Sequence, residues 1–474
     1  MKREKCCWLL LGMIGILLIF TCLRHEEQKK KSEVPVRQDT GAAETGSNPE
    51  QDTEKVEAVG TGEESERKTE ATETASVGKM TSETEIRVLI RSDSFESLYH
   101  QEERIAFQTA YTCSTDSGRS FSCEPGSEFV FPLENSDGME TVWNFEPTEG
   151  EGSFSMPLLK RGYDHPVYHG SLTVTASEEG YLFRNTVDLE TYLCAVVPSE
   201  MPARYPSEAL KAQAVCARTY AYSQLGNGRL ADYEADVDDS VEFQVYNNFP
   251  EDSRSSQAVE GTKGIRMLKN GELVDARYYS TSCGIDLTRD LSEEAVFCAF
   301  LSDRDREDYE KDEPWYRWNT FFTLEQLTRL SEDAGYELGQ VTELSIGSRE
   351  ESGCVSVLRI QGTKGSREVS GEYAIRKFLK PLENPVTLQN GETAPDLGML
   401  PSAFFYLTEE KTEEALTGYA VVGGGYGHGI GMSQNGAMHM AEAGESFEAI
   451  LKHYYGEVTL YEEGNSAGQT ISEG

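Results

Sequence analysis

Basic residues are scarce in this chain of 474 residues. It contains 43 Lys and Arg against 82 Asp and Glu, which gives a net charge of −39. Proteins bind nucleic acids by neutralising phosphates with Lys and Arg, so this balance argues against a nucleic-acid partner. It also argues against broad adhesion to an anionic membrane surface. The length permits two to four domains or one elaborate domain.

The pattern of cysteines typical of a disulfide framework is also lacking. The chain has ten Cys and no CxxC pair, and Cys6, Cys7 and Cys22 lie in or beside an N-terminal apolar run. The seven that remain are an odd number, so a disulfide framework is not indicated. Cys113 and Cys123 flank a turn-like segment, and we expect that they can pair across a hairpin.

One uncharged apolar run stands near the N-terminus. It extends for 18 residues from Cys6 to Leu23, after Lys2, Arg3 and Lys5. This length is near the lower limit for a helix that spans a bilayer. The run is not followed by a clear small-x-small cleavage site. We therefore favour an uncleaved signal anchor that comprises residues 1–23 rather than a signal peptide that is removed. We therefore predict a single-pass protein of the cell membrane with its large C-terminal portion outside.

Large aliphatic and aromatic residues are nearly absent from 24–84. Such a segment cannot bury enough apolar surface to offset the entropy lost on ordering. It is predicted to be a disordered acidic linker rich in Thr, Ser and Glu. Folded character begins near Ile86. We predict one folded domain over 85–463 and a flexible tail over 464–474.

Strand-like and helix-like segments are mixed along the folded part. Strands are predicted at 86–90, 128–132, 141–145, 167–176, 181–185, 355–361, 367–369 and 419–422. Helices are predicted at 207–225, 255–262, 323–334, 371–379 and 447–455. The fold class expected from this order is α+β, with mixed sheets and packed helices that form a groove.

Glu200 is a candidate for acid–base chemistry. It stands between Pro198 and Pro202 in a segment predicted to be a turn-rich loop, with Pro198 interrupting a helix that Asp188 caps. Ser207 is expected to cap the next helix. Apolar neighbours would raise the pKa of a carboxyl group here, and such a group acts as a general acid and then as a base. The alternative is an ordinary carboxylate at a helix start.

A glycine-rich segment lies at Gly423–Ala437. It contains seven Gly in 15 residues, so its backbone approaches another group closely. It does not match GxGxxG, and it lacks the Lys of a phosphate-binding loop. His428 in this segment either faces a ligand or is buried and hydrogen-bonded. Ser433 and Gln434 begin a predicted helix.

Hydroxyl and thiol groups are concentrated at Ser280–Cys283. A Ser nucleophile acting with His428 is conceivable, but no nucleophile elbow surrounds it. A cysteine hydrolase built on Cys283 is no better supported. Cys283 and Cys298 can pair or bind a metal, yet two thiols do not complete a tetrahedral zinc site. We predict no metal.

Several long motifs together resemble one known family. The segment VPSEMPARYPSEALKAQAVCARTYA resembles the signature of the SpoIID/LytB family, which comprises stage II sporulation protein D and amidase enhancer proteins. IRVLI, VYHGSLTV, NTVDLETYL, DVDDSVEFQVY, STSCG and GGGYGHGIGMSQNGA stand in the family order. The resemblance extends over about 86–455.

The resemblance implies chemistry on peptidoglycan. SpoIID-type proteins are lytic transglycosylases that cleave between N-acetylmuramic acid and N-acetylglucosamine, preferentially in strands stripped of stem peptides, and leave 1,6-anhydro ends. Glu200 matches the catalytic Glu of the family. A single carboxyl suffices because the muramoyl C6 hydroxyl replaces water, so the paired carboxylates of ordinary glycosidases are not needed. The alternative implied is a noncatalytic wall-binding enhancer of an N-acetylmuramoyl-L-alanine amidase, and a role in sporulation is one context.

The resemblance also implies a glycan groove. The residues expected to bind substrate are Tyr279, Ser280, Thr281, Ser282, Tyr426, His428, Ser433 and Gln434. Tyrosines, including Tyr278, would stack on sugar faces, while Gln213 and Arg218 would order the loop that carries Glu200.

Two positions depart from the family pattern. Tyr279 stands where many members have His, and Phe243 stands where a Cys is often found. Some members bind zinc through that His and nearby Cys. Because Tyr is not a usual zinc ligand, no metal and no other cofactor is carried over to this chain.

Overall fold

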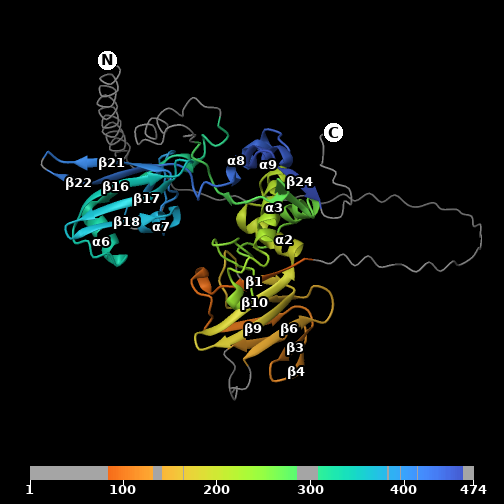
Figure 1. Ribbon diagram of the computed structural model, residues 1–474. Coiled ribbons are helices and arrows are strands. Elements are labelled where there is room, and N and C mark those ends of the chain that lie inside the picture. Colours follow the sequence, from red (N-terminus) through yellow and green to blue (C-terminus); the bar gives the residue numbers. More distant parts are fainter. Residues whose placement is uncertain are drawn as a thin grey trace, which may run out of the picture. The chain divides into compact units, whose positions relative to one another are not determined.

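The computed structural model describes residues 84–131, 141–163, 165–284, 308–381, 384–394, 397–413 and 415–462. The predicted signal anchor, nearly all of the linker and the C-terminal tail lie outside these residues, as does Cys298. Within the described ranges, no helix is long and apolar enough to cross a bilayer. The structure confirms an α+β fold with several sheets, of which the seven-stranded sheet is mixed (Figure 1).

The first region is built on a seven-stranded sheet with the order β11-β1-β10-β9-β6-β3-β4. Figure 1 shows this sheet in orange and yellow. Its strands are β1 (Glu85–Ile90), β3 (Tyr111–Thr115), β4 (Ser120–Cys123), β6 (Val142–Pro147), β9 (Ser171–Ser177), β10 (Gly180–Asp188) and β11 (Val237–Asp238). The pair β1–β11 is parallel and the other pairs are antiparallel.

A four-stranded antiparallel sheet shares the same core. Its strands, in the order β5-β2-β7-β8, are β5 (Glu128–Phe131), β2 (Glu103–Phe107), β7 (Ser153–Ser155) and β8 (Val167–His169). The Phe131 and Trp143 rings lie 5.3 Å apart, and the Phe107 and Phe145 rings 5.4 Å. These aromatic contacts join the two sheets.

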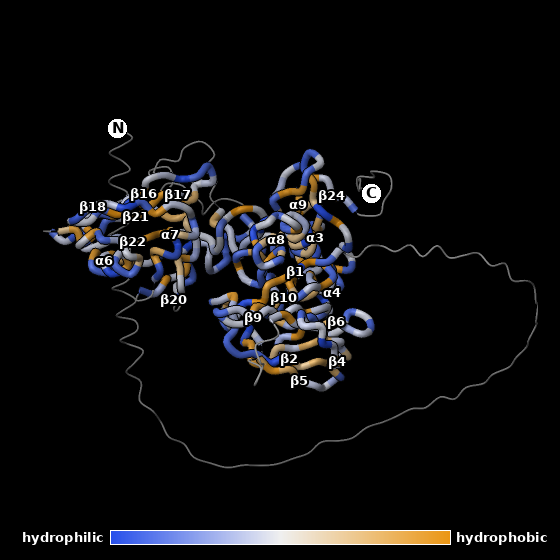
Figure 2. Tube along the Cα trace, turned by 60° about the horizontal axis from the view of Figure 1, so that its bottom comes forward, coloured by the Kyte–Doolittle hydropathy of each residue, from blue (hydrophilic) through white to orange (hydrophobic). Residues whose placement is uncertain are grey.

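Alternation of side chains explains these strands. Leu172 and Val174 are buried on β9, as the period of two predicts, while their neighbours are partly exposed. On β1, Ile86, Val88 and Ile90 are fully buried, and Figure 2 shows hydrophobic colour there.

The predicted Cys113–Cys123 disulfide is wrong. Both residues lie in the β3–β4 hairpin, but Cys113 pairs with Phe121 and Cys123 pairs with Tyr111. The turn places the two cysteines two positions out of register, so they are not opposite each other, and no disulfide joins them.

Five helices complete the first core: α2 (Leu189–Glu200), α3 (Ser207–Gln224), α4 (Ser253–Gly261), α8 (Gln434–Glu442) and α9 (Phe447–Tyr455). Ala209, Ala212, Ala214, Ala217 and Ala221 are fully buried on α3. Their small side chains let α4, α8 and α9 pack closely against this helix.

The helix boundaries around Glu200 correct two predictions. Asp188 caps α2, as expected, by accepting hydrogen bonds from two backbone N–H groups. Pro198 does not interrupt the helix, because in its last turn the missing N–H removes only one hydrogen bond. Glu200 is therefore the last helical residue, not part of a loop. Pro206, rather than Ser207, occupies the N-cap of α3, without a side-chain cap.

A small sheet, β13-β12-β24, also packs on α3. Its strands are β12 (Ile265–Lys269), β13 (Glu272–Leu273) and β24 (Thr459–Glu462). Asn270 and Gly271 join β12 to β13 with φ of 55° and 86°. These positive φ values are typical of a two-residue hairpin turn.

A second core is inserted between two short strands of the first region, β14 (Tyr278–Tyr279) and β23 (Met432–Ser433). Its sheets have the orders β20-β19-β15-β22-β21 and β16-β17-β18. The strands are β15 (Trp318–Thr323), β16 (Val341–Arg349), β17 (Val355–Gly362), β18 (Gly365–Ser370), β19 (Val386–Leu388), β20 (Thr393–Ala394), β21 (Phe405–Lys411) and β22 (Leu416–Gly423), and the helices are α6 (Leu324–Asp333) and α7 (Glu372–Phe378).

A buried ion pair anchors the loop 239–248 beside Glu200. Arg161 and Asp239 lie 2.6 Å apart, and both side chains are fully buried. Asp239 also accepts a hydrogen bond from the Arg91 N–H, and Arg161 donates to the Arg91 carbonyl. Burial raises the pKa of Asp239 to about 6, although the charge of Arg161 lowers it.

We predict that Arg161→Met destabilises the protein by about 3–5 kcal/mol, because it leaves a buried carboxylate without its partner. Urea unfolding measures this change. Arg104→Met provides the control, since the Arg104–Glu128 pair is about half exposed and its loss should cost less than about 1 kcal/mol. Equal losses in the two variants would contradict the prediction.

Candidate functional site

A cavity of about 570 Å³ opens beside Glu200. It is bounded by α2, β14, the glycine-rich segment and α7 of the second core. Seven of the residues predicted from the sequence to act in the site line it: Glu200, Tyr278, Tyr279, Ser280, Tyr426, His428 and Gln434. The fold thus brings most of the predicted site together from distant parts of the chain.

The Glu200 carboxyl group is enclosed but reaches the cavity. Burial is the main effect on its pKa, which is raised to about 7. Hydrogen bonds from the Val245 N–H, at 2.6 Å from Oε1, and from the Tyr278 hydroxyl act in the opposite direction by favouring the carboxylate. The group is therefore divided between acid and carboxylate near neutral pH.

Gln244 determines how Tyr278 meets Glu200. Its Nε2 donates to the Tyr278 hydroxyl oxygen at 2.9 Å and to the Ala217 carbonyl at 3.3 Å. Tyr192 donates to its Oε1 at 3.4 Å. Because the Tyr278 oxygen accepts from Gln244, its own proton is available to Glu200. Gln244 and Val245 lie in a motif that the sequence shows, but their hydrogen bonds to Tyr278 and Glu200 were not predicted.

Gln434 fixes the backbone that carries Glu200. Its Nε2 donates to the Glu200 carbonyl at 3.0 Å and to Gln213 Oε1 at 3.4 Å. Gln213 is fully buried, so this contact joins α3, α8 and the end of α2. Arg218 is also buried, but it binds Glu190 at the start of α2.

Glu310 is a second enclosed carboxyl group that the sequence did not indicate. Its Oε1 accepts hydrogen bonds from Ser433 Oγ at 2.6 Å and from the Ser282 N–H at 2.9 Å. Burial raises its pKa to about 7. Ser433 is thus committed to Glu310 rather than to the Glu200 cavity. Glu310 follows a charged, irregular segment that carries no motif.

Thr281 and Ser282 belong to a neighbouring hollow of about 680 Å³. Tyr279 lines both this hollow and the Glu200 cavity. Thr281 is buried, and its backbone exchanges two hydrogen bonds with Tyr426. This bridge attaches the STSCG segment to the glycine-rich segment.

The glycines allow close approach to the protein's own backbone. A Cβ at Gly431 would lie 1.9 Å from the Arg277 carbonyl oxygen, and one at Gly427 would lie 2.7 Å from the Tyr279 Cβ. Both glycines also have positive φ. The segment is therefore glycine-rich because it packs against β14.

His428 is partly buried in the cavity wall. Burial lowers its pKa, so the imidazole is mostly neutral at pH 7. Its Nδ1 accepts from the Ile430 N–H at 3.1 Å. No hydrogen bond joins His428 to Ser280 or Ser282 in the described part of the chain, so the geometry gives no support to a Ser nucleophile.

The described residues contain no group of three or more His, Cys, Asp and Glu arranged to hold a metal ion. The resemblance implies a zinc-ligating His at the position of Tyr279, and burial raises the pKa of this tyrosine far above its ordinary value. A neutral phenol is a poor zinc ligand, so Tyr279 does not fit the zinc site that the resemblance implies for some members.

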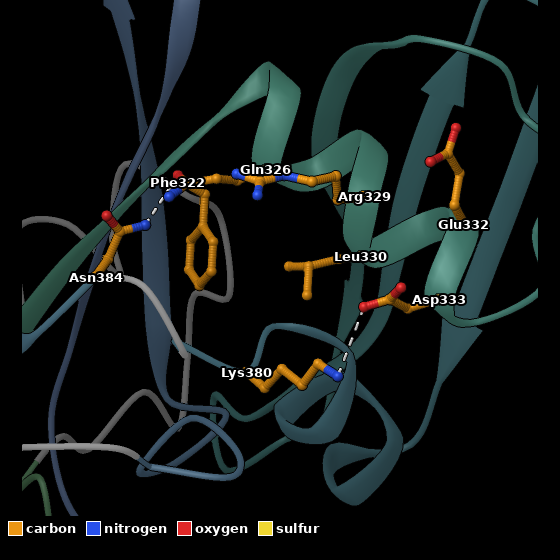
Figure 3. A pocket seen from close by; sticks show the side chains of 8 residues that line it. All are labelled: Phe322, Gln326, Arg329, Leu330, Glu332, Asp333, Lys380 and Asn384. Carbon is orange, nitrogen blue, oxygen red and sulfur yellow. Dashed lines mark hydrogen bonds and ion pairs between the residues drawn. The ribbon is translucent and has the colours of Figure 1, made fainter.

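A further hollow of about 350 Å³ lies beside α6 (Figure 3). Phe322 and Leu330 are among its apolar lining residues. Four of its polar side chains form two pairs: Asn384 donates to Gln326, and Lys380 lies 3.8 Å from Asp333. It has no enclosed acid comparable to Glu200, so we place the candidate site at the first cavity.

Comparison with known proteins identifies two matching segments. A family model described as Stage II sporulation protein matches residues 177–268. A model described as a domain of unknown function, DUF8618, matches residues 271–431. The first match contains Glu200 and Val245, and the second contains the inserted core.

The chain is also similar to curated proteins. An amidase enhancer of Bacillus subtilis is 30% identical over 56% of this chain and 40% of its own length. Stage II sporulation protein D of the same organism is 26% identical over 57% of this chain and 73% of its own. The protein of that name from Bacillus amyloliquefaciens is 26% identical over 73% and 88%. This chain thus spans about two fifths of the amidase enhancer. The family-model match over residues 177–268 and these relatives together support the assignment of this chain to the SpoIID/LytB family.

Proposed function

We propose that this protein is a lytic transglycosylase of peptidoglycan. It would cleave the bond between N-acetylmuramic acid and N-acetylglucosamine in glycan strands, preferentially those without stem peptides. Residues 1–23 would anchor it in the cell membrane, and 24–84 would let the folded domain reach the wall outside. The similarity to stage II sporulation protein D supports a role in sporulation.

The enclosed Glu200 carboxyl group carries this proposal. It combines a pKa of about 7 with access to a cavity of about 570 Å³. A general acid works best when its pKa lies near the operating pH. Enclosure holds the proton on the acid, while Val245 and Tyr278 stabilise the carboxylate left after the proton is transferred.

The reaction follows from one carboxyl group used twice. Protonated Glu200 donates its proton to the glycosidic oxygen as the bond from that oxygen to the muramoyl C1 breaks. The carboxylate then takes the proton of the muramoyl C6 hydroxyl as its oxygen bonds to C1. The products are a 1,6-anhydro end and a new free hydroxyl, and Glu200 regains its proton. No water is consumed.

The remaining cavity residues would hold the sugars. Tyr279 and Tyr426 offer rings for stacking, while Ser280 and His428 offer polar groups. Gln434 would act by fixing the Glu200 backbone, with Gln213 behind it. Thr281 and Ser282 would contact the strand in the neighbouring hollow.

A second candidate is a noncatalytic enhancer of a cell-wall amidase. The similarity to a protein named amidase enhancer favours it. In that case the cavity would bind glycan without cutting it, and the amidase would be the partner. The two candidates differ in whether 1,6-anhydro ends appear.

Replacement of Glu200 tests the activity directly. We expect the full-length protein in detergent to produce 1,6-anhydromuramoyl ends from peptide-free glycan strands, and Glu200→Gln to produce at least about 10³-fold fewer, because the amide cannot transfer a proton. Mass spectrometry counts the ends. Glu368→Gln, which changes an exposed carboxylate on β18, should retain activity. If neither the native protein nor Glu200→Gln cuts, but both accelerate an added amidase, the enhancer function is correct.

Tyr278 should set the pH range of cleavage. Its hydrogen bond lowers the pKa of Glu200, so Tyr278→Phe should raise that pKa by about one unit. The reactive form of free enzyme carries protonated Glu200, and kcat/KM therefore falls as pH rises through this pKa. We expect the alkaline limb of the pH profile to move upward in Tyr278→Phe and to stay in place in Tyr220→Phe. A downward shift, or none, would refute this role.

A further inference from the structure

Two arginines face the cavity that contains Glu200. Arg277 and Arg376 both line it, together with the acidic residues Glu200, Glu242 and Glu372. This placement stands out in a chain with 43 basic and 82 acidic residues. Cations at this position would attract an anionic group on the molecule that enters.

The backbone of Arg277 is held firmly at the start of β14. Its carbonyl accepts hydrogen bonds from the Tyr455 hydroxyl at 2.6 Å and from the Met432 N–H at 3.1 Å. Its guanidinium group pairs with Asp275, and the two side chains are 42% and 62% exposed. Such an exposed pair contributes little stability, so the guanidinium can turn to another anion.

Arg376 approaches the cavity from α7. Its Nε donates to the Leu400 carbonyl at 3.0 Å, and its Nη1 lies 3.1 Å from Glu372 Oε2. Its Nη2 has no hydrogen-bond partner among the residues that the structure describes. The Pro401 carbonyl accepts from the Gly427 N–H at 2.9 Å, which attaches this segment to the glycine-rich wall of the cavity.

His428 lies close enough to both arginines to sense their charge. After burial, the effects that lower its pKa come from Arg277 and Arg376, while Glu372 raises it. The neutral imidazole adds no charge to the two guanidinium groups. Arg277, Arg376 and His428 all line the same cavity.

We propose that Arg277 and Arg376 bind the carboxylate of the lactyl group on the muramoyl residue that is cleaved. A guanidinium group presents parallel N–H donors that match a carboxylate. This inference rests on the proposed function. The lactyl carboxylate is free only after the amide bond to the stem peptide has been hydrolysed. The two arginines would thus account for the preference for strands without stem peptides that is part of the proposed function.

Two substrates that differ only at the lactyl group test the proposal. One is a peptide-free glycan strand with free carboxylates, and the other is the same strand coupled to methylamine. Full-length native protein should cleave the carboxylate strand with a kcat/KM about 10- to 100-fold higher, the range expected for loss of a charge-assisted hydrogen bond. Arg376→Gln and Arg277→Gln should each lower that ratio at least about fivefold.

Controls separate recognition from folding. Arg359→Gln changes an exposed arginine on β17 and should keep the native ratio. Thermal unfolding identifies any variant that is not folded, and the other arginine then provides the test. A native protein that cleaves both strands equally would overturn the proposal. It would also be overturned if both folded arginine variants kept the native ratio.

Binding distinguishes failure of this inference from failure of the proposed activity. Calorimetry with Glu200→Gln measures affinity for a short muramoyl oligosaccharide as the free acid and as the methylamide, without cleavage. Preference for the acid that Arg376→Gln removes supports the carboxylate site even if no strand is ever cut. Equal binding of the acid and the methylamide would overturn the site, even where cleavage by the native protein upholds the proposed function.

Discussion

The parallel pairing of β14 with β23 is the constraint on which the site depends. It places Tyr278 beside Met432 and Tyr279 beside Ser433, although more than 150 residues separate the strands. Successive residues on a strand face opposite sides. Tyr278 thus reaches Glu200, while Tyr279 lies in the surroundings of Glu310. Ser433 and Gln434 also serve the two sides separately. Ser433 binds Glu310, and Gln434 holds the Glu200 backbone.

Enclosure and hydrogen bonding act against each other at Glu200. Burial alone would keep the carboxyl protonated and make it a weaker acid. The Val245 N–H offsets part of that effect. Val245 keeps its place because the loop 239–248 begins at Asp239, which is fixed by Arg161 in the core. A buried ion pair of this kind is expensive to break, and here its contribution is to keep a donor aligned with the acid.

Local signals in the sequence predicted local structure well. The helices predicted at 447–455 and 323–334 are present as Phe447–Tyr455 and Leu324–Asp333, because their patterns depend on neighbouring residues. The predicted helix break at Pro198 was wrong because the destabilisation caused by a proline depends on its position within the helix. Glu310 was missed because its partner Ser433 lies 123 positions later. The position of Arg376 in the cavity could not be predicted either, because it depends on how the second core folds against the glycine-rich segment.

The second core adds a wall to the cavity that contains Glu200, and in the proposed function this wall would help to select the substrate. Its chain leaves the first region after β14 and returns at β23, so both of its connections lie beside Glu200. Any helix placed near those connections can add a wall to the cavity without disturbing α2. Here α7 supplies that wall with Arg376. The family model for stage II sporulation protein ends at residue 268, before this insertion. Glu200 thus lies in the segment that the family model matches, whereas Tyr278, which acts on its pKa, and Arg376, which would bind substrate in the proposed function, lie beyond that segment.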